Sequence, residues 1–405
     1  MSHFTFKAKK PTGEIYSSEK DAADRYELYK LLREHGDEVV EFKEKTITGG
    51  FNFNMKLSIF SHVKTIDKIN FARNLGAMLE AGLALSRALS VLERQTKNKV
   101  WKEIVTDLIA EIDRGITFAD ALSKHSKVFP PIFIAMVHAG EQSGTLAESL
   151  KVIATQMDSA YSLDKRIKGA LMYPAVIVTA MVIIAVLMFI FVIPTLLKTF
   201  TDLNVKLPFT TRMVVDVSNI IQNQGLIVLA VLLVFVGFLY WFSLQTKGKI
   251  ILHALFLKIP VIGGLVQGVN TARTARTLSS LLGSGVDVVE SVNITASVVQ
   301  NVHFRKVLED AAISIKKGDL VSKTFNEHTD LYPVFFAEMM SVGEETGKTG
   351  EMLLGVARYF ENDVEQKTKD MSTIIEPFLI LLIGAAVGFF AISMIQPMYS
   401  LVNVI

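Results

Sequence analysis

Residues Pro130 to Glu148 read PPIFIAMVHAGEQSGTLAE, and a related stretch, PVFFAEMMSVGEETGKTGE, occupies Pro333 to Glu351. The two stretches lie 203 residues apart, and the same offset pairs further residues on both sides without a gap. Among these pairs are Arg73 with Arg276, Gly82 with Gly285, Gly115 with Gly318, Met136 with Met339, Pro174 with Pro377 and Pro194 with Pro397. The sequence therefore contains two copies of one unit, at about 71–194 and 274–397.

The composition favours a membrane protein built from two such units. Of the 405 residues, 50% are hydrophobic and 20% are charged, and the apolar residues are concentrated in long runs. The chain has no cysteine, which excludes disulfides and thiolate metal sites. Its 42 Lys and Arg nearly balance its 40 Asp and Glu, so nothing indicates a nucleic-acid partner.

The first 45 residues predict a small α/β segment. No apolar run opens the chain, so we expect no secretory signal peptide. A hairpin around Pro11–Gly13, a helix at about 21–34 and a further strand near Val39 are the expected elements. Residues 46–65 contain Gly49–Gly50 and no periodicity, which is typical of a linker.

From residue 66 onward the apolar residues recur at three- and four-residue spacing, which predicts a helical bundle at 66–172. Gly140 and Gly144 are expected in a turn before a long helix that begins near Thr145. Thr145 and Glu148 have the spacing of a capping box. The repeat predicts a second bundle at 245–374.

Three long stretches lack charged residues. The 29 positions between Lys168 and Lys198 are sufficient to cross a hydrocarbon core of roughly 30 Å. The predicted transmembrane helices are 173–196, 224–244 and 375–396, with a loop at 197–223 and a tail at 397–405. The predicted fold class is therefore an all-α membrane protein with two repeated bundles and three transmembrane helices, plus the N-terminal α/β segment.

Basic residues flank the bundle ends of these helices, which predicts that both bundles and the N-terminus are cytoplasmic. The flanking residues are Lys165, Arg166, Lys168, Lys247, Lys249, Lys258, Lys367 and Lys369. Each unit then reads as a bundle followed by an outward crossing, so we expect the repeats to be related by a pseudo-twofold axis along the membrane normal.

The sequence predicts no catalytic site, no metal and no cofactor. Gly343 to Thr349 resembles a phosphate-binding loop, but its glycines are separated by three residues instead of four and follow a predicted helix. No two of the eight histidines have the helical spacing of a metal site. Apart from Glu376 at the start of the third, the predicted transmembrane helices contain no charged residue, which disfavours a transporter. The prolines at their ends, Pro174, Pro194, Pro377 and Pro397, are interpreted as helix punctuation, with a hinge as the alternative.

The duplicated acidic turns are the candidate partner-binding residues. They comprise Gly140, Glu141, Gly144 and Glu148 in the first unit and Gly343, Glu344, Gly347 and Glu351 in the second. Local stability is the simpler explanation, because acids near a helix N-terminus are stabilised by its dipole. Glu351 has Lys348 at the position of Thr145 and therefore no predicted capping role, which favours a contact beyond the bundle.

With these features the sequence resembles the type II secretion system F family, which includes inner-membrane platform proteins of type IV pilus machines. The resemblance covers about 66–397. It is carried by FARNL at 71–75, MLEAG at 78–82, GEQSG at 140–144, Tyr173-Pro174, GEETG at 343–347 and Glu376-Pro377.

The resemblance implies a non-enzymatic, multi-pass inner-membrane protein that couples a cytoplasmic hexameric ATPase to the insertion or extraction of pilin or pseudopilin subunits. It also implies contacts with other inner-membrane assembly proteins and membrane lipid, and a homo-oligomer. A subunit of a membrane transport or competence DNA-uptake complex is the alternative, and a membrane enzyme would require a nucleotide or metal site.

Overall fold

The structure, a computed structural model, describes residues 2–9, 15–22, 38–45, 63–202, 208–260 and 262–402. They belong to two units, 1–62 and 63–405. In the first unit, strands β1 (Ser2–Lys9), β2 (Ile15–Ala22) and β3 (Glu38–Lys45) form an antiparallel sheet with β1 in the centre. The helix predicted at about 21–34 begins on the last residues of β2 and otherwise lies outside the described residues. Residues 46–62 of the linker predicted at 46–65 also lie outside them, and α2 begins at its last residue, Thr65. The α/β class of this segment therefore stays a prediction.

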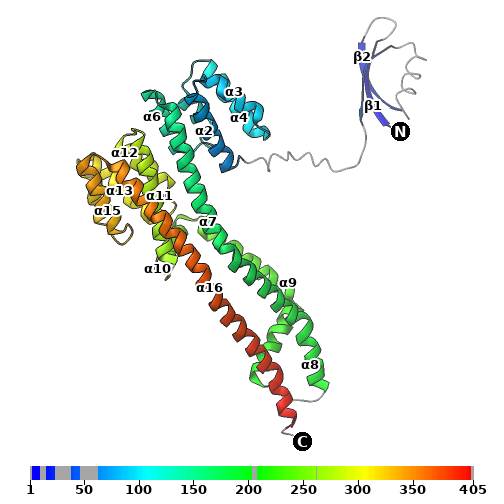
Figure 1. Cartoon of the computed structure of the whole chain (residues 1–405). Coiled ribbons are helices and arrows are strands. Elements are labelled where there is room, and N and C mark those ends of the chain that lie inside the picture. The colour runs from blue at the N-terminus through cyan, green and yellow to red at the C-terminus, as the bar shows by residue number, and fades with distance from the viewer. Residues whose placement is uncertain are drawn as a thin grey trace. The chain divides into compact units, whose positions relative to one another are not determined.

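The described part of the second unit is helical, and its two bundles have the same element order (Figure 1). Bundle 1 contains α2 (Thr65–Glu80), α3 (Leu85–Gln95), α4 (Lys99–Asp113), α5 (Phe118–Ser123), α6 (Pro131–Ser143) and the first part of α7 (Leu146–Leu187). Bundle 2 contains α11 (Ile262–Gly283), α12 (Val288–Val298), α13 (Val302–Lys316), α14 (Val321–Asn326), α15 (Val334–Thr346) and the first part of α16 (Thr349–Val402). Both ends of α3, α4, α5 and α6 recur 203 residues later in α12, α13, α14 and α15. The predicted all-α class and the repeated bundles are confirmed.

Left-handed glycines end corresponding helices in the two bundles. Positive φ angles among the described residues occur at Gly82, Gly115 and Gly144 and at their counterparts Gly285, Gly318 and Gly347. Gly144, at φ 72°, lets the chain reverse between α6 and α7 in two residues, and Gly347, at φ 70°, does the same between α15 and α16. A side chain would strain the backbone here, so these turns require glycine.

The predicted capping box at Thr145 and Glu148 is wrong. Thr145 has φ −108° and ψ 32°, its side chain caps no backbone N–H of α7, and its hydroxyl contacts Ser143 Oγ at 2.7 Å. The physical reason is the tight glycine turn immediately before it, because a capping side chain needs an extended N-cap residue. Glu148 is exposed.

Gly140 and Gly343 lie inside helices instead of in turns, and each permits a close helix contact. A Cβ atom on Gly140 would come within 2.6 Å of Ser149 Cβ in α7, and one on Gly343 within 2.6 Å of Thr349 Cα in α16. Atoms cannot approach so closely without a shift of the backbone. The two glycines therefore let α6 lie against α7 and α15 against α16.

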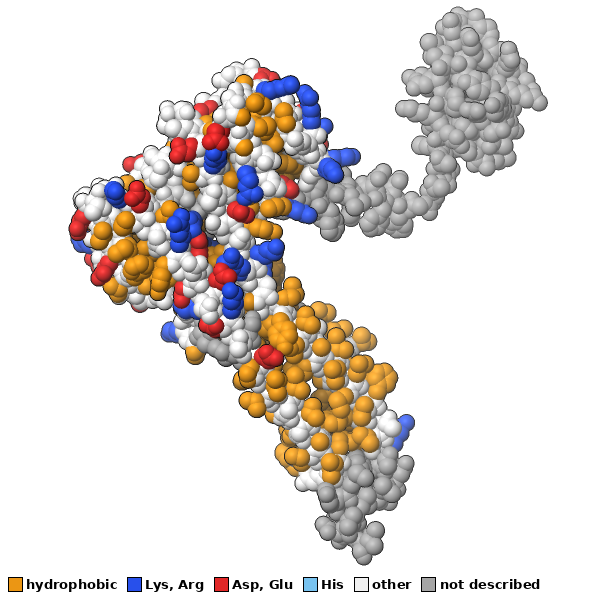
Figure 2. All heavy atoms as spheres, in the orientation of Figure 1, with side chains coloured by type: hydrophobic (Ala, Val, Ile, Leu, Met, Phe, Trp, Pro, Cys, Tyr) orange, Lys and Arg blue, Asp and Glu red, His pale blue; other side chains and the backbone are white. Residues whose placement is uncertain are grey.

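Three helical stretches are long and apolar enough to cross a membrane, as predicted: 146–198, 209–244 and 349–396. The first comprises α7, a π-helical turn, η2 (Met188–Val192), and part of α8 (Ile193–Asp202), the second is α9 (Phe209–Leu244), and the third is α16. Figure 2 shows hydrophobic side chains covering these helices, whereas charged side chains gather over the bundles. Exposed apolar side chains at this density are typical of a lipid-facing surface.

The helices α7 and α16 pass without a break from bundle to membrane. The domain limits predicted at 172/173 and 374/375 fall inside them, and so do Pro174 and Pro377. Pro194 lies in α8 and Pro397 near the end of α16. In α9, by contrast, Gln224 has a non-helical φ of −127°, at the residue where the second predicted transmembrane helix begins.

Polar side chains join the three membrane helices at the end far from the bundles. Ser218 Oγ and Gln222 Nε2 in α9 donate to the carbonyl of Phe189 in η2, at 2.8 and 3.4 Å. Thr211 Oγ1 donates to the carbonyl of Ser393 in α16, at 2.5 Å. A π-turn leaves carbonyls without their usual helical partner, so Ser218 and Gln222 give the Phe189 carbonyl hydrogen bonds that lipid cannot provide.

After α9, a short helix, α10 (Thr246–Lys258), returns the chain to bundle 2. The chain then bends by 112° between α10 and α11. Gly248 makes the first corner possible, since a Cβ atom there would lie 1.9 Å from the carbonyl oxygen of Phe242. Bundle 2 is thus held close to the end of the second membrane helix.

Gly140→Ala is expected to destabilise bundle 1 by about 1–3 kcal/mol, because the new methyl group overpacks against Ser149. Gly169→Ala, in open space on α7, is the matched control and should stabilise the helix by roughly 0.5–1 kcal/mol. Denaturant unfolding in detergent, followed by the fluorescence of buried Trp101 in a Trp241→Phe background, measures both. Equal stability of the two variants would show that the α6–α7 contact is not tight.

Candidate functional site

The two bundles contact each other through different faces. In bundle 1 the contact is made by α6 and α7, and in bundle 2 mainly by α11 and α12, with α16 lying against α7. Within the described residues, α15 makes no comparable contact with α2 or α3, which a twofold relation would require. The predicted pseudo-twofold axis is therefore wrong for the bundles: the contact is heterologous, joining two dissimilar surfaces.

Apolar and polar groups both hold this contact. Leu281, Val286 and Ile294 of bundle 2 are buried in the same cluster as the core of bundle 1. Beside them Gln156 of α7, only 7% exposed, donates from Nε2 to Thr277 Oγ1 and accepts from Ser280 Oγ, both at 3.3 Å. A buried amide without such partners would be costly, so this pairing fixes the register of α7 on α11.

Ion pairs extend the contact towards the membrane. Asp164 of α7 pairs with Arg273 of α11, and Arg166 of α7 pairs with Glu365 of α16. The Arg273 side chain is 11% exposed and that of Asp164 is 42% exposed, so this pair is only partly removed from water. The two bundles are thus tied by charge as well as by apolar packing.

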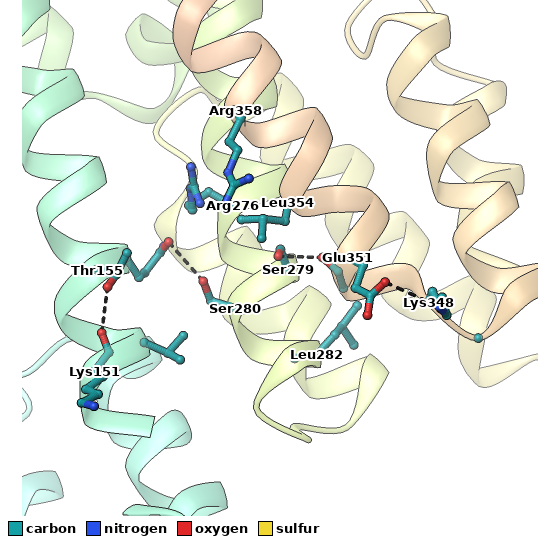
Figure 3. A pocket seen from close by; sticks show the side chains of 15 residues that line it. Lys151, Thr155, Arg276, Ser279, Ser280, Leu282, Lys348, Glu351, Leu354 and Arg358 are labelled. Atoms are coloured by element: carbon teal, nitrogen blue, oxygen red, sulfur yellow. Dashed lines mark hydrogen bonds and ion pairs between the residues drawn. The ribbon is translucent and has the colours of Figure 1, made fainter. Parts of the chain in front are cut away.

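A cavity of about 620 Å³ opens between α7, α11 and the first turns of α16 (Figure 3). Its charged lining comprises four cations, Lys151, Arg276, Lys348 and Arg358, and one anion, Glu351. The excess of positive charge makes the cavity suited to an acidic group of a partner.

The lining cations differ in how strongly they are paired. Arg276 binds Glu361 through two hydrogen bonds, of 2.8 and 2.5 Å, and Lys151 binds Glu80 at 2.5 Å. Lys348 lies 3.9 Å from Glu351, with both side chains mostly exposed. Arg358 has no ion-pair partner within the described part of the chain. Arg358 and Lys348 are therefore the cations most available to a ligand.

The bidentate pair in this cavity has a counterpart in bundle 1. Arg73 and Asp158, the residues 203 positions before Arg276 and Glu361, form an ion pair at 3.0 Å that ties α2 to α7. The repeat in the sequence pairs the two arginines, but their acidic partners were not predicted. The signal was present, because the same offset also places an acid at both partner positions.

The inner acids of the duplicated turns hold short helices. Glu141 accepts hydrogen bonds from the backbone N–H groups of Phe118 and Ala119, at 2.8 and 3.1 Å. Glu344 accepts them from Val321 and Ser322, at 2.6 and 3.0 Å. Each carboxylate thus neutralises the N-terminus of a short helix, α5 or α14.

The outer acids, Glu148 and Glu351, are both exposed and make no comparable backbone contact. Of the eight predicted residues, Gly347 and Glu351 line the cavity between the bundles, and those of the first turn do not. The structure therefore separates an inner, helix-capping acid from an outer, accessible one in each turn. No group of three or more His, Asp or Glu side chains suited to a metal occurs among the residues described.

Comparison with known proteins gives consistent similarities over the whole chain. The model of the family described as type II secretion system (T2SS), protein F matches twice, at 71–194 and 274–397. A type IV pilus assembly protein, PilC, of Thermus thermophilus is 32% identical over 406 residues, which cover 100% of this chain and 99% of that protein. PilC of Myxococcus xanthus is 29% identical, covering 100% and 96% of the two chains. Type II secretion system protein F of Vibrio cholerae is 25% identical, covering 100% and 99%.

Glu344→Gln is expected to lower the free energy of unfolding by about 1–2 kcal/mol, because the amide retains one acceptor and no charge for two N–H donors. Glu351→Gln, on an exposed side chain, should change it by at most about 0.5 kcal/mol. Denaturant unfolding of the two variants compares them directly. A loss of equal size at both positions would contradict the division into inner and outer acids.

Proposed function

Because this chain belongs to the type II secretion system protein F family, we propose that it is the inner-membrane platform protein of a type IV pilus or type II secretion machine. In this role it couples a cytoplasmic hexameric ATPase to the insertion or extraction of pilin or pseudopilin subunits. The role is non-enzymatic: the protein transmits motion between a soluble partner and a membrane-embedded one.

The observation that carries this proposal is the continuity of α7 and α16. These helices have 42 and 54 residues, or about 60 and 80 Å at 1.5 Å per residue, and each begins at an acidic turn and continues into the membrane. A displacement at the turn is therefore passed along one helix towards the membrane end. The contact between α7 and α16 makes the two helices move as a pair.

The ATPase contacts the protein at the duplicated turns and at the cavity beside the second turn. In this arrangement Gly140, Gly144, Gly343 and Gly347 set the backbone, Glu141 and Glu344 hold α5 and α14, and Glu148 and Glu351 meet the partner. Exposure of both outer acids supports this assignment. Arg358 and Lys348, the latter 3.9 Å from Glu351, add positive charge at the second turn only, so the two turns differ in what they bind.

The membrane helices receive the pilin or pseudopilin. Their exposed apolar side chains suit the transmembrane helix of a small subunit, and the polar contacts at their far end hold the three helices together while that subunit moves. Other inner-membrane assembly proteins and lipid cover the remaining surface.

Both bundles and the N-terminus face the cytoplasm in this proposal. The basic flanks, among them Lys165, Arg166 and Lys168, support that orientation.

Because the chain has no cysteine, its orientation can be tested with single reporters. Ser123→Cys in bundle 1, Thr329→Cys in bundle 2 and Phe209→Cys at the start of α9 all occupy exposed positions. A thiol reagent that does not cross the membrane should label only Phe209→Cys in intact cells and all three after permeabilisation. Labelling of one bundle but not the other in intact cells would contradict the shared cytoplasmic side.

Replacing both outer acids, Glu148→Gln with Glu351→Gln, should weaken ATPase binding roughly three- to tenfold and reduce pilus or pseudopilus assembly. Glu309→Gln on α13, an equally exposed acid away from the turns, is the matched control and should leave both unchanged. Co-purification of the ATPase and counts of assembled fibres measure the effects. Full binding and assembly by the double variant would show that the outer acids do not receive the ATPase.

A further inference from the structure

The internal repeat allows each surface of bundle 1 to be compared with the same surface of bundle 2. On α6 and α7, Ile132 and Gln156 are both 7% exposed. Gln156 contacts bundle 2 through its hydrogen bonds, and Ile132 lies in the buried cluster that residues of bundle 2 share. Their counterparts on α15 and α16, Phe335 and Tyr359, are 42% and 56% exposed. The surface of α6 and α7 that is buried in bundle 1 is therefore exposed to solvent on the equivalent helices, α15 and α16, of bundle 2.

The complementary face shows the reverse pattern. On α11 and in the turn after it, Thr277, Ser280 and Val286 are buried against bundle 1. Their counterparts Asn74, Ala77 and Leu83, on α2 and in the turn after it, are exposed. Within the chain, the α6/α7 face of bundle 1 packs on the α11/α12 face of bundle 2. The equivalent α15/α16 face of bundle 2 and the equivalent α2/α3 face of bundle 1 both stay exposed.

We propose that these open halves bind each other between two copies of the chain. We call Val334, Phe335, Glu338, Val342 and Tyr359 the α15/α16 face, and Asn74, Ala77, Leu83, Arg87, Val91 and Arg94 the α2/α3 face. The α15/α16 face of one copy packs on the α2/α3 face of the next, in the way that α6 and α7 pack on α11 and α12 within the chain.

The α15/α16 face has the chemistry of an interface. Phe335 and Tyr359 form an edge-to-face pair with ring centroids 5.2 Å apart, so their side chains are already ordered by each other. Val334 and Val342, which are 52% and 40% exposed, extend this apolar surface. Figure 2 shows hydrophobic side chains gathered over the region where Figure 1 labels α15. Ordered aromatic groups of this kind are enriched at the centres of protein interfaces.

The two faces also carry opposite charges that the contact within the chain lacks. On α15, Glu338 stands where α6 has Ala135. On α3, Arg87 and Arg94 flank Val91 at helical spacing, where α12 has Glu290 and Ser297. Because α6 contacts α12 within the chain, the same packing between copies places α15 on α3, with acid against base.

The geometry is compatible with a membrane. The two units are parallel, since each runs from its bundle into a membrane helix, so repeating the relation between them keeps all bundles on one side. The contact is heterologous, and successive copies therefore close into a ring or extend into a row. The proposal deepens the self-association of a platform protein, because it names the surfaces, and it does not depend on which ATPase or pilin binds.

Disulfide cross-linking tests the contact, using positions equivalent to Gln156 and Ser280. Chains carrying Tyr359→Cys and chains carrying Ala77→Cys, with different tags, are produced together and oxidised in native membranes. Both positions are exposed, so the fold should be retained. We expect a disulfide-linked dimer that contains both tags, and much less product when either variant is expressed alone. The positive control, Gln156→Cys with Ser280→Cys in one chain, should form a disulfide within the monomer.

Three results would overturn the proposal: no two-tag dimer while the control forms, Tyr359→Cys dimers of a single tag as the main product, or capture of a different protein by Tyr359→Cys. A charge reversal provides the second measurement. Glu338→Arg should reduce the cross-linked fraction about fivefold, and Arg87→Glu in the neighbouring copy should restore it. If the parent chain bound no ATPase while the two-tag cross-link formed, the proposed function would be wrong and this contact would still stand.

Discussion

The contact of α6 with α7 at Gly140, repeated by α15 with α16 at Gly343, is the constraint on which the rest of the structure depends. A missing side chain lets the two helices meet at a distance that any Cβ atom would prevent. The left-handed glycine that follows turns the chain within two residues. Together these glycines set the direction in which α7 and α16 leave their bundles. Because the same helices cross the membrane, that direction also sets how each bundle stands on its transmembrane helix.

One folding unit thus serves two different environments. The helix limits and left-handed glycines agree between the bundles, whereas surface residues at equivalent positions differ. Gln156 satisfies its buried amide at the contact between the bundles, and Tyr359, its counterpart, presents a ring to the outside. A duplicated unit keeps the residues that its internal packing requires. Its outer faces then diverge according to what covers them.

The heterologous contact gives the pair of bundles a polarity that a twofold arrangement would not have. The α6/α7 and α11/α12 faces are buried inside the chain, whereas the equivalent face on the other bundle stays exposed in each case. The cavity lies beside this contact and takes lining residues from α7 and α16, so a ligand there touches both helices that enter the membrane.

The sequence by itself determined the repeat, the helical class of the repeated units, the three membrane helices and the turns at Gly144 and Gly347. These features depend on local chemistry: the spacing of apolar residues, the length of uncharged runs and the conformations open to glycine. Only the tertiary structure decided the roles of the repeated residues. Glu141 and Glu344 were placed in the turns, yet they hold backbone groups 22 and 23 residues away. The contact between the bundles was likewise undetermined, because a repeat fixes what each unit is and leaves open which faces meet. That choice depends on the summed packing of side chains such as Ile132, Gln156 and Leu281, which are distant in sequence and adjacent only after folding.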